Sequence, residues 1–231
     1  MSIADNYKSV MGRITAAARR VNRDPSSIKL VTVTKTVSIE GIREALAAGA
    51  AIFGENRVQE AKEKIEQLGR TASWHLIGHL QTNKAKYAVK LFDLIHSVDN
   101  LELAAELDKQ AAKMGKIQDV LVEVNIAGEA AKAGVAIDDA INLVKQAAKF
   151  RNIRIKGLMT MPPFSDNPED SRPYFKKLKQ LSAMITAENI PGVSMTDFSM
   201  GMSNDFEIAI EEGATLVRVG TAIFGERNSG R

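Results

Sequence analysis

Short β-branched, apolar runs alternate with helical stretches along almost the whole chain of 231 residues. An amphipathic helix is expected first, over residues 2–22, and each of the eight β-rich runs that follow it is succeeded by a helical pattern. Several runs are apolar on both faces, as strands of a buried parallel sheet are. The runs are 28–34, 50–54, 73–78, 91–98, 119–126, 155–161, 195–200 and 215–220. Eight βα units of this size predict a (β/α)8 TIM barrel with an extra N-terminal helix.

An open, doubly wound sheet is the rival α/β fold, but no Gly-rich dinucleotide fingerprint follows the first strand to favour it. No Pro-, Ser- or Gly-rich linker divides the chain, so one domain over residues 1–231 is expected. Residues 162–171 form the one long irregular loop, and residues 225–231 are expected to be a flexible tail.

Composition narrows the class of protein. The 31 basic and 28 acidic residues leave a net charge of only +3, which gives little support to nucleic-acid binding. The absence of cysteine excludes disulfides, thiolate catalysis and cysteine-bound metal, and the three histidines show no ligand spacing. The sequence begins without a secretory signal and has no membrane-length apolar stretch, so we expect a cytoplasmic protein.

Chemistry in such a barrel belongs at the C-terminal ends of the strands. Several polar residues stand at those ends and are therefore expected on one rim: Lys35, Glu55, Asn56, Arg57, His79, Asn125 and Thr160.

A phosphate site is predicted from the loops after the last two strands. Ser203 precedes the helical pattern "FEIAI" and is expected to be its N-cap, which leaves amide groups of the first turn free for an anion. Gly220 and Thr221 follow the last strand and offer an amide and a hydroxyl beside it. Each residue could instead have only a local structural role, but barrels frequently bind phosphate between these two loops.

Arg218 is expected to point into the barrel. Leu216, Arg218 and Gly220 share one face of the last strand, whereas the two valines between them suit the outer face beneath the helices. A buried guanidinium needs a planar or anionic partner, which is either a ligand or a barrel carboxylate such as Glu123.

Lys35 ends the first strand, on the same face as Val31 and Val33. A lone lysine there usually points into solvent. With a phosphate site and an inward arginine nearby, it instead suits pyridoxal 5′-phosphate (PLP), whose aldehyde forms a Schiff base with a lysine amine.

The chain resembles the pyridoxal phosphate homeostasis protein family, the YggS/PROSC-like proteins. The resemblance lies in "VTKT", "FGENRVQE", "WHLIGHLQTNK", "VNIAGEAAKAG", "GLMTMPP" and the block 198–225, which occur in order over almost the whole chain. It implies a barrel similar to the N-terminal domain of alanine racemase, with PLP as cofactor and no assigned turnover.

The resemblance also implies roles for single residues. Lys35 matches the Schiff-base lysine, and Asn56 lies in a turn near the cofactor ring. Arg218 matches an arginine near the ring nitrogen, although contact with the phosphate is left open. Three residues fall at the phosphate site: Ser203, Gly220 and Thr221. His79 stands where the family often has proline, so no essential role is assigned to it.

Two functions are compatible with these residues. One is a PLP-binding protein that acts as carrier or regulator in vitamin B6 homeostasis, as a monomer, with PLP-dependent enzymes as expected recipients. The alternative is a PLP-dependent, racemase-like enzyme.

A two-base racemase needs a second acid/base group opposite the lysine. The three tyrosines all lie in helical stretches, and His75 and His96 are expected to be satisfied core residues. The sequence therefore favours a binding protein without catalytic residues.

Overall fold

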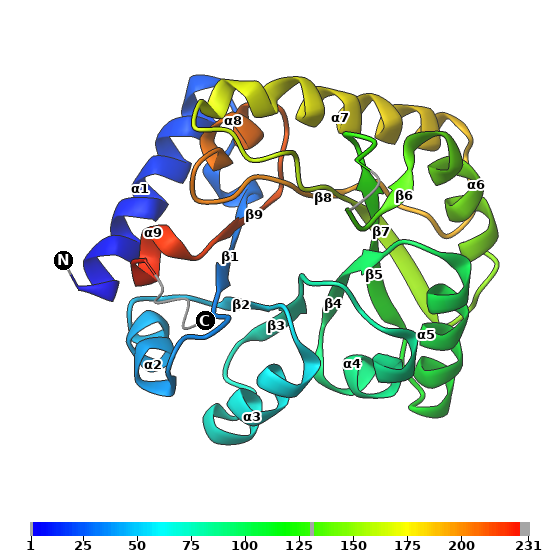
Figure 1. The fold of residues 1–231 in the computed structure, drawn as a ribbon, viewed down its shortest axis with the longest axis horizontal. Coiled ribbons are helices and arrows are strands. Elements are labelled where there is room, and N and C mark those ends of the chain that lie inside the picture. The colour runs from blue at the N-terminus through cyan, green and yellow to red at the C-terminus, as the bar shows by residue number, and fades with distance from the viewer. Residues whose placement is uncertain (1, 130–131, 227–231) are drawn as a thin grey trace.

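A closed ring of parallel strands forms the centre of the molecule in the computed structural model, which describes residues 2–129 and 132–226 (Figure 1). The ring contains β1 (Lys29–Val33), β2 (Ile52–Glu55), β3 (Ser73–Leu76), β4 (Leu94–Val98), β5 (Gln118–Asn125), β7 (Ile153–Met159), β8 (Asp197–Ser199) and β9 (Leu216–Val219). Each strand pairs in parallel with the next, and the pairing of β1 with β9 closes the ring. The (β/α)8 barrel predicted from the sequence is confirmed.

Helices surround the ring on its outer side (Figure 1). They are α1 (Ile3–Arg20), α2 (Ile39–Ala47), α3 (Val58–Leu68), α4 (Ala85–Leu91), α5 (Leu101–Lys113), α6 (Ile137–Ala147), α7 (Arg172–Ala187), α8 (Phe206–Glu211) and α9 (Thr221–Phe224). Single 3₁₀ turns lie at η1 (Pro25–Ser27), η2 (Thr82–Lys84) and η3 (Pro168–Ser171). The extra helix α1 packs against α2, α8 and α9, so it covers the junction between the first and last βα units.

The apolar residues form two separate cores. The larger one lies between strands and helices, and includes Phe53, Trp74 and Phe206. The smaller one fills the inside of the barrel with side chains from alternate positions of the strands. Its buried members are Val31, Val33, Ile77, Leu94, Leu121, Met159 and Leu216. The inward direction of β1 and β9 agrees with the predicted alternation.

Some boundaries differ from the sequence prediction. The run expected to begin at Leu91 becomes strand only from Leu94, because Leu91 ends α4 and the Phe92 amide still bonds to the Ala88 carbonyl. A two-residue strand, β6 (Val135–Ala136), pairs with the end of β5 and is too short for periodicity to reveal. The predicted tail 225–231 lies outside the described residues from 227 onward.

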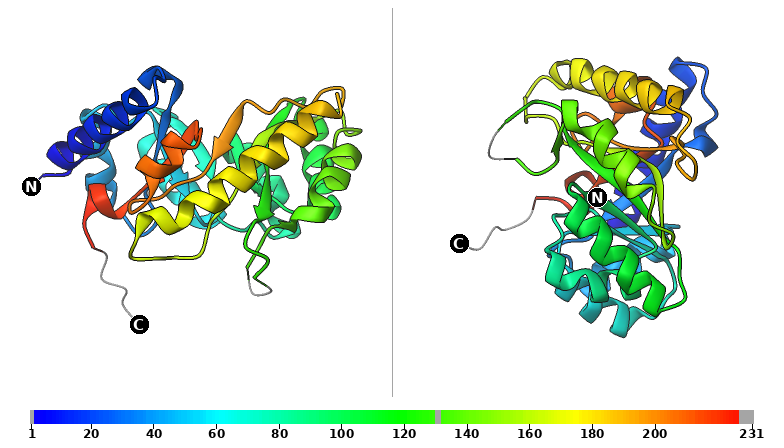
Figure 2. Two further views of the ribbon diagram at one scale, coloured as in Figure 1. Left: turned by 90° about the horizontal axis from the view of Figure 1, so that it is seen from above. Right: turned by 90° about the vertical axis from the view of Figure 1, so that its right-hand side faces the viewer.

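The segments that follow β5 and β7 project from the same side of the barrel (Figure 2). This is the side at which the parallel strands end, where the rim residues were predicted. In the part of the chain that the structure describes, no helix combines the length and apolar character needed to cross a membrane.

Candidate functional site

A cavity of about 420 Å³ opens at the C-terminal ends of the strands. All six predicted binding residues line it, and they lie in or after four of the strands, β1, β2, β8 and β9: Lys35, Asn56, Ser203, Arg218, Gly220 and Thr221. Its remaining wall includes Val33 and Ile77 of the inner core and the exposed Phe164 of the long loop after β7. The size is within the range of sites for small ligands.

Lys35 lies in the turn that follows β1 and is exposed to solvent at the cavity. The strand itself ends at Val33, so Lys35 is two residues beyond the regular alternation. Thr36, the next residue, has a φ of 60°, in the left-handed region that β-branched residues rarely adopt. On either side of Lys35, the Thr34 carbonyl oxygen and the Thr36 amide form hydrogen bonds with side chains of α3.

Asn56 follows β2 directly and is held in place by the close approach of Gly78. A Cβ atom at Gly78 would lie 2.5 Å from the Asn56 carbonyl oxygen and 2.8 Å from its Cα. Only glycine lets the loop after β3 pass this close to the Asn56 backbone.

Arg218 points into the barrel, as predicted, and is 3% exposed. Its guanidinium donates to the Ser199 Oγ at 2.5 Å and to the Thr160 carbonyl oxygen at 2.9 Å. Burial lowers the pKa of Arg218 to about 10, although the charges of Glu123 and Asp205 act in the opposite direction. Glu123 influences Arg218 electrostatically but does not form an ion pair with it within 4 Å among the described residues. Its neutral hydrogen-bond partners leave Arg218 a cation facing the cavity.

A chain of buried side chains continues from Arg218 into the barrel. The Ser199 Oγ lies 2.8 Å from Nδ1 of His96, whose Nε2 lies 3.0 Å from Nδ1 of His75. Burial lowers the pKa of His75 to about 4, and burial also lowers the pKa of His96 well below its usual range. Both histidines are thus neutral, hydrogen-bonded core residues, as the sequence indicated.

The predicted role of Ser203 as N-cap of the "FEIAI" helix is wrong. Asp205 precedes α8 directly, and its carboxylate accepts hydrogen bonds from the Met202 amide at 2.7 Å and from the Ser171 hydroxyl at 2.8 Å. A carboxylate at this helix start opposes a phosphate there, because the two negative charges repel each other. The sequence "SND" holds three residues that can cap, and the residue nearest the helix takes the position.

Ser203 contacts the next loop instead. Its Oγ accepts from the amides of Gly220 and Ala222, both at 3.4 Å. These are long hydrogen bonds, and the hydroxyl proton is still available to a ligand. Ser203, Gly220 and Thr221 therefore meet on one wall of the cavity, where amide and hydroxyl donors can bind an anion.

The sequence analysis misplaced Glu55 and missed its partner Lys64. Glu55 was expected on the rim, but its side chain points outward from β2 and is fully buried against α3. There the Lys64 ammonium lies 2.8 Å from the Glu55 carboxylate. The spacing of Glu60 and Lys64, four residues apart on one helix, indicates that the two can pair, but it does not indicate that Lys64 is buried.

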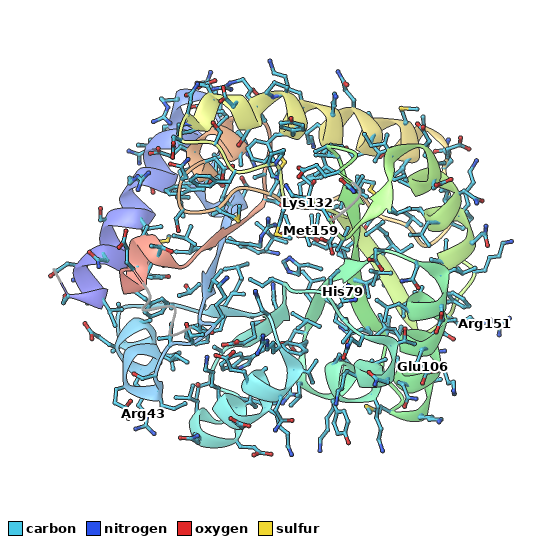
Figure 3. The ribbon with its side chains drawn as sticks, in the orientation of Figure 1. Arg43, His79, Glu106, Lys132, Arg151 and Met159 are labelled. Carbon is cyan, nitrogen blue, oxygen red and sulfur yellow. The ribbon has the colours of Figure 1, made fainter. Side chains whose placement is uncertain are left out.

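A neighbouring and larger cavity, of about 620 Å³, shares Asn56, Gly78 and His79 with the first. His79 points toward the middle of the ring in Figure 3, whereas Arg43 and Arg151 lie on the outer side of the molecule. The His79 side chain is 57% exposed and lies 3.9 Å from the Asp99 carboxylate. Lys35 and Arg218 both line the smaller cavity, and neither lines the larger one. The smaller cavity is therefore the candidate site.

Residues 9–228 match the family described as "Alanine racemase, N-terminal domain". The pyridoxal phosphate homeostasis protein of Aquifex aeolicus is 46% identical over 98% of this chain and 99% of its own length. The protein of that name from Escherichia coli is 37% identical over 98% and 97% of the two chains.

Among solved structures, PipY of Synechococcus elongatus with PLP bound has a TM-score of 0.85 and 36% identity, over 97% of this chain and 100% of PipY. An alanine racemase of Clostridium difficile in complex with cycloserine has a TM-score of 0.77 at 17% identity, over 98% of this chain and 61% of the racemase. This second likeness shows a shared fold.

Proposed function

The chain belongs to the family of pyridoxal phosphate homeostasis proteins, within the fold family of the alanine racemase N-terminal domain, and from this premise we propose that it binds PLP covalently through Lys35. Its role is PLP homeostasis, as carrier or regulator. The observation that carries the proposal is that Lys35 and Arg218 line one cavity with the hydroxyl and amide donors of the last two loops. The bound PLP of the similar PipY structure also supports it.

The residues present fit this cofactor. When bound, PLP supplies an aldehyde that condenses reversibly with a primary amine, together with a phosphate and a ring nitrogen. Lys35 is the lysine on the cavity wall, and its exposed amine can reach a ligand there. Ser203, Gly220 and Thr221 provide neutral donors for the phosphate, and Arg218 provides the cation. Asn56 is assigned to the part of the cavity near the ring.

The exposure of Lys35 suits reversible loading. An exposed amine at this position would bind an aldehyde reversibly, releasing one water on binding, and it would remain accessible to the water or second amine that frees the ligand. The buried hydrogen bonds of Arg218, on the neighbouring strand β9, hold that part of the wall in place, so this part of the cavity is formed before the ligand arrives.

We assign binding without turnover to this site. Besides Lys35 and Arg218, the described titratable side chains on its wall are His79 and Asp205. Asp205 is committed to the Met202 amide and the Ser171 hydroxyl, and the His79 side chain is largely in solvent. Neither is held as a second acid/base group. Chiral chromatography after incubation of the PLP-loaded protein with alanine, serine and glutamate tests this; turnover near one per second or faster would favour the racemase-like alternative.

The remaining parts of the proposal concern the whole chain. We propose that residues 1–231 act as one PLP-binding domain, as a monomer in the cytoplasm, with PLP-dependent enzymes as recipients. Sedimentation of the PLP-loaded protein measures whether it is a monomer. Transfer of PLP from the loaded protein to an apo-enzyme measures whether such enzymes are recipients.

The decisive experiment is borohydride reduction of the PLP-loaded protein followed by a peptide map. We expect the reduced adduct on Lys35. Lys35→Ala should remove the visible absorption of the bound cofactor, with no loss of fold because the residue lies at the rim. Lys84→Ala, in the neighbouring cavity, is the matched control. An adduct on Lys84 or another lysine, with Lys35 unmodified, would refute the assignment.

A further inference from the structure

The backbone on both sides of Lys35 is anchored to helix α3 behind the barrel wall. The Lys64 ammonium donates to the Thr34 carbonyl oxygen at 2.5 Å. The Thr36 amide donates to the Glu60 carboxylate, also at 2.5 Å. Lys35 thus lies between two residues that are each bound by a charged side chain of the same helix. Hydrogen bonds to charged groups are the stronger kind.

Lys64 is the centre of this anchor. Its side chain is 8% exposed, and its ammonium also lies 2.8 Å from the Glu55 carboxylate and 2.6 Å from that of Glu60. With the Thr34 carbonyl, these three oxygens match the three donors of an ammonium group. Lys64 is therefore fixed in one position, unlike the exposed Lys35.

Glu55 and Glu60 complete the anchor from two sides. Glu55 accepts from the Thr34 hydroxyl at 2.6 Å, so Thr34 is held through both its side chain and its carbonyl. Burial raises the pKa of Glu55, and Lys64 acts against that rise. Burial would raise the pKa of Glu60 as well, but its hydrogen bonds with Lys64 and Thr36 lower it overall, so Glu60 is a carboxylate at neutral pH.

We propose that Lys64 is a positioning residue for Lys35. The turn after β1 includes Thr36 in a left-handed conformation, which is unfavourable for a β-branched residue. The Lys64 and Glu60 contacts stabilise that turn, and the turn directs Lys35 to the cavity. Without the anchor the turn relaxes and the Lys35 amine spends less time at the ligand. This inference rests on the proposed function, because it assigns a support to the covalent step of that site.

Two ligands separate positioning from a general loss of structure. PLP uses the Lys35 amine, whereas pyridoxine 5′-phosphate has an alcohol in place of the aldehyde and uses only the other contacts. For Lys64→Met we expect the affinity for PLP to fall about 10- to 100-fold, the range expected when one strained turn is no longer held. The affinity for pyridoxine 5′-phosphate should change less than about twofold.

Two further variants complete the design. Lys62→Met, on the same helix but with a side chain 45% exposed and paired with Glu66, is the matched control and should change neither affinity. Because Lys64→Met leaves Glu55 without its cation, it could fail to fold. Glu60→Ala then tests the same idea, since the Glu60 side chain is 26% exposed and its loss leaves the Lys64–Glu55 pair intact. Glu60→Ala should also lower the affinity for PLP while changing the affinity for pyridoxine 5′-phosphate little.

A measurement on the ligand-free protein supplies an independent readout. Hydrogen exchange of the Thr36 amide should be faster in Lys64→Met and Glu60→Ala than in the wild type, with no change in Lys62→Met. The role of Lys64 would be overturned if the test variants lost affinity for both ligands equally, or if both variants kept their affinity for PLP unchanged. A wild-type protein that gives no reduced adduct on Lys35 would instead refute the proposed function, and this inference with it.

Discussion

Glu123 gives the sharpest test of the electrostatics inside the barrel. It lies on β5 and is 3% exposed. Burial raises its pKa to about 7, and the negative charge of Asp99 adds to the rise, while Arg218 opposes it. A carboxyl with this pKa is half neutral near physiological pH. Glu123→Gln keeps the shape of the side chain and removes its titrating carboxyl, so it isolates this effect.

The direction of the pH effect follows from the two pKa values. In the unfolded chain the carboxyl titrates near 4.5, so between pH 4.5 and 7 the folded state of the wild type binds more protons than the unfolded state. The contribution of the neutral Glu123 carboxyl to stability is therefore fully present below pH 4.5 and is lost as the pH rises through 7. The difference between a pKa of 4.5 and one of about 7 corresponds to a loss on the order of 3 kcal/mol, at about 1.4 kcal/mol per pH unit. Glu123→Gln does not suffer this loss.

The assay is urea unfolding of the ligand-free proteins from pH 5 to pH 8. We expect the free energy of unfolding of Glu123→Gln, minus that of the wild type, to increase with pH by about 2 to 3 kcal/mol. The buried histidines titrate in both proteins, so their effect cancels in the difference. Glu102→Gln, the same substitution on the exposed face of α5, is the matched control. A flat or decreasing difference for Glu123→Gln would show that its carboxyl is not raised by burial.

Two further predictions concern the cavity walls. Ser203→Ala combined with Thr221→Val should lower the affinity for PLP on the order of 100-fold, because two hydrogen bonds to a charged phosphate are worth about 1.5 kcal/mol each or more. Isothermal titration measures it, and unchanged affinity would remove these hydroxyls from the phosphate site. Gly78→Ala should destabilise the protein by about 1 to 3 kcal/mol in urea unfolding, because its methyl group collides with the Asn56 backbone; an unaltered midpoint would show that this loop gives way freely.

The sequence predicts the inner face of the wall well. Inward positions of a strand repeat every two residues, so Val31, Val33 and Leu216 identify the direction in which Arg218 points. The rule needs no knowledge of partners, because a strand with one buried face cannot slip by one residue without exposing that face. The ring of eight strands follows from the same local pattern.

The hydrogen-bond partner of a polar side chain in a loop is not predictable in this way. Ser203 was assigned to the helix that follows it, yet it contacts the loop of Gly220, 17 residues further on. Asp205 occupies the helix start instead. Both residues can cap, and the difference depends on which loop lies within reach of each, a property of the folded chain that residue type does not determine.

On the outer face of the barrel wall, too, the partner of a polar side chain could not be predicted from the sequence. Glu55 ends β2 pointing toward α3, and its partner Lys64 comes from the second turn of that helix. In sequence, Lys64 looks like any solvated helix lysine, and lysines are rarely buried. Its burial is favourable only because Glu55, Glu60 and the Thr34 carbonyl all lie within 2.8 Å of its ammonium. Rearranging this group is costly, since moving any one of the three oxygens leaves a buried ammonium donor without an acceptor. The turn that contains Lys35 is hydrogen-bonded to Lys64 and Glu60. The contacts that hold the backbone of this solvent-exposed lysine therefore lie on the outer side of the barrel wall.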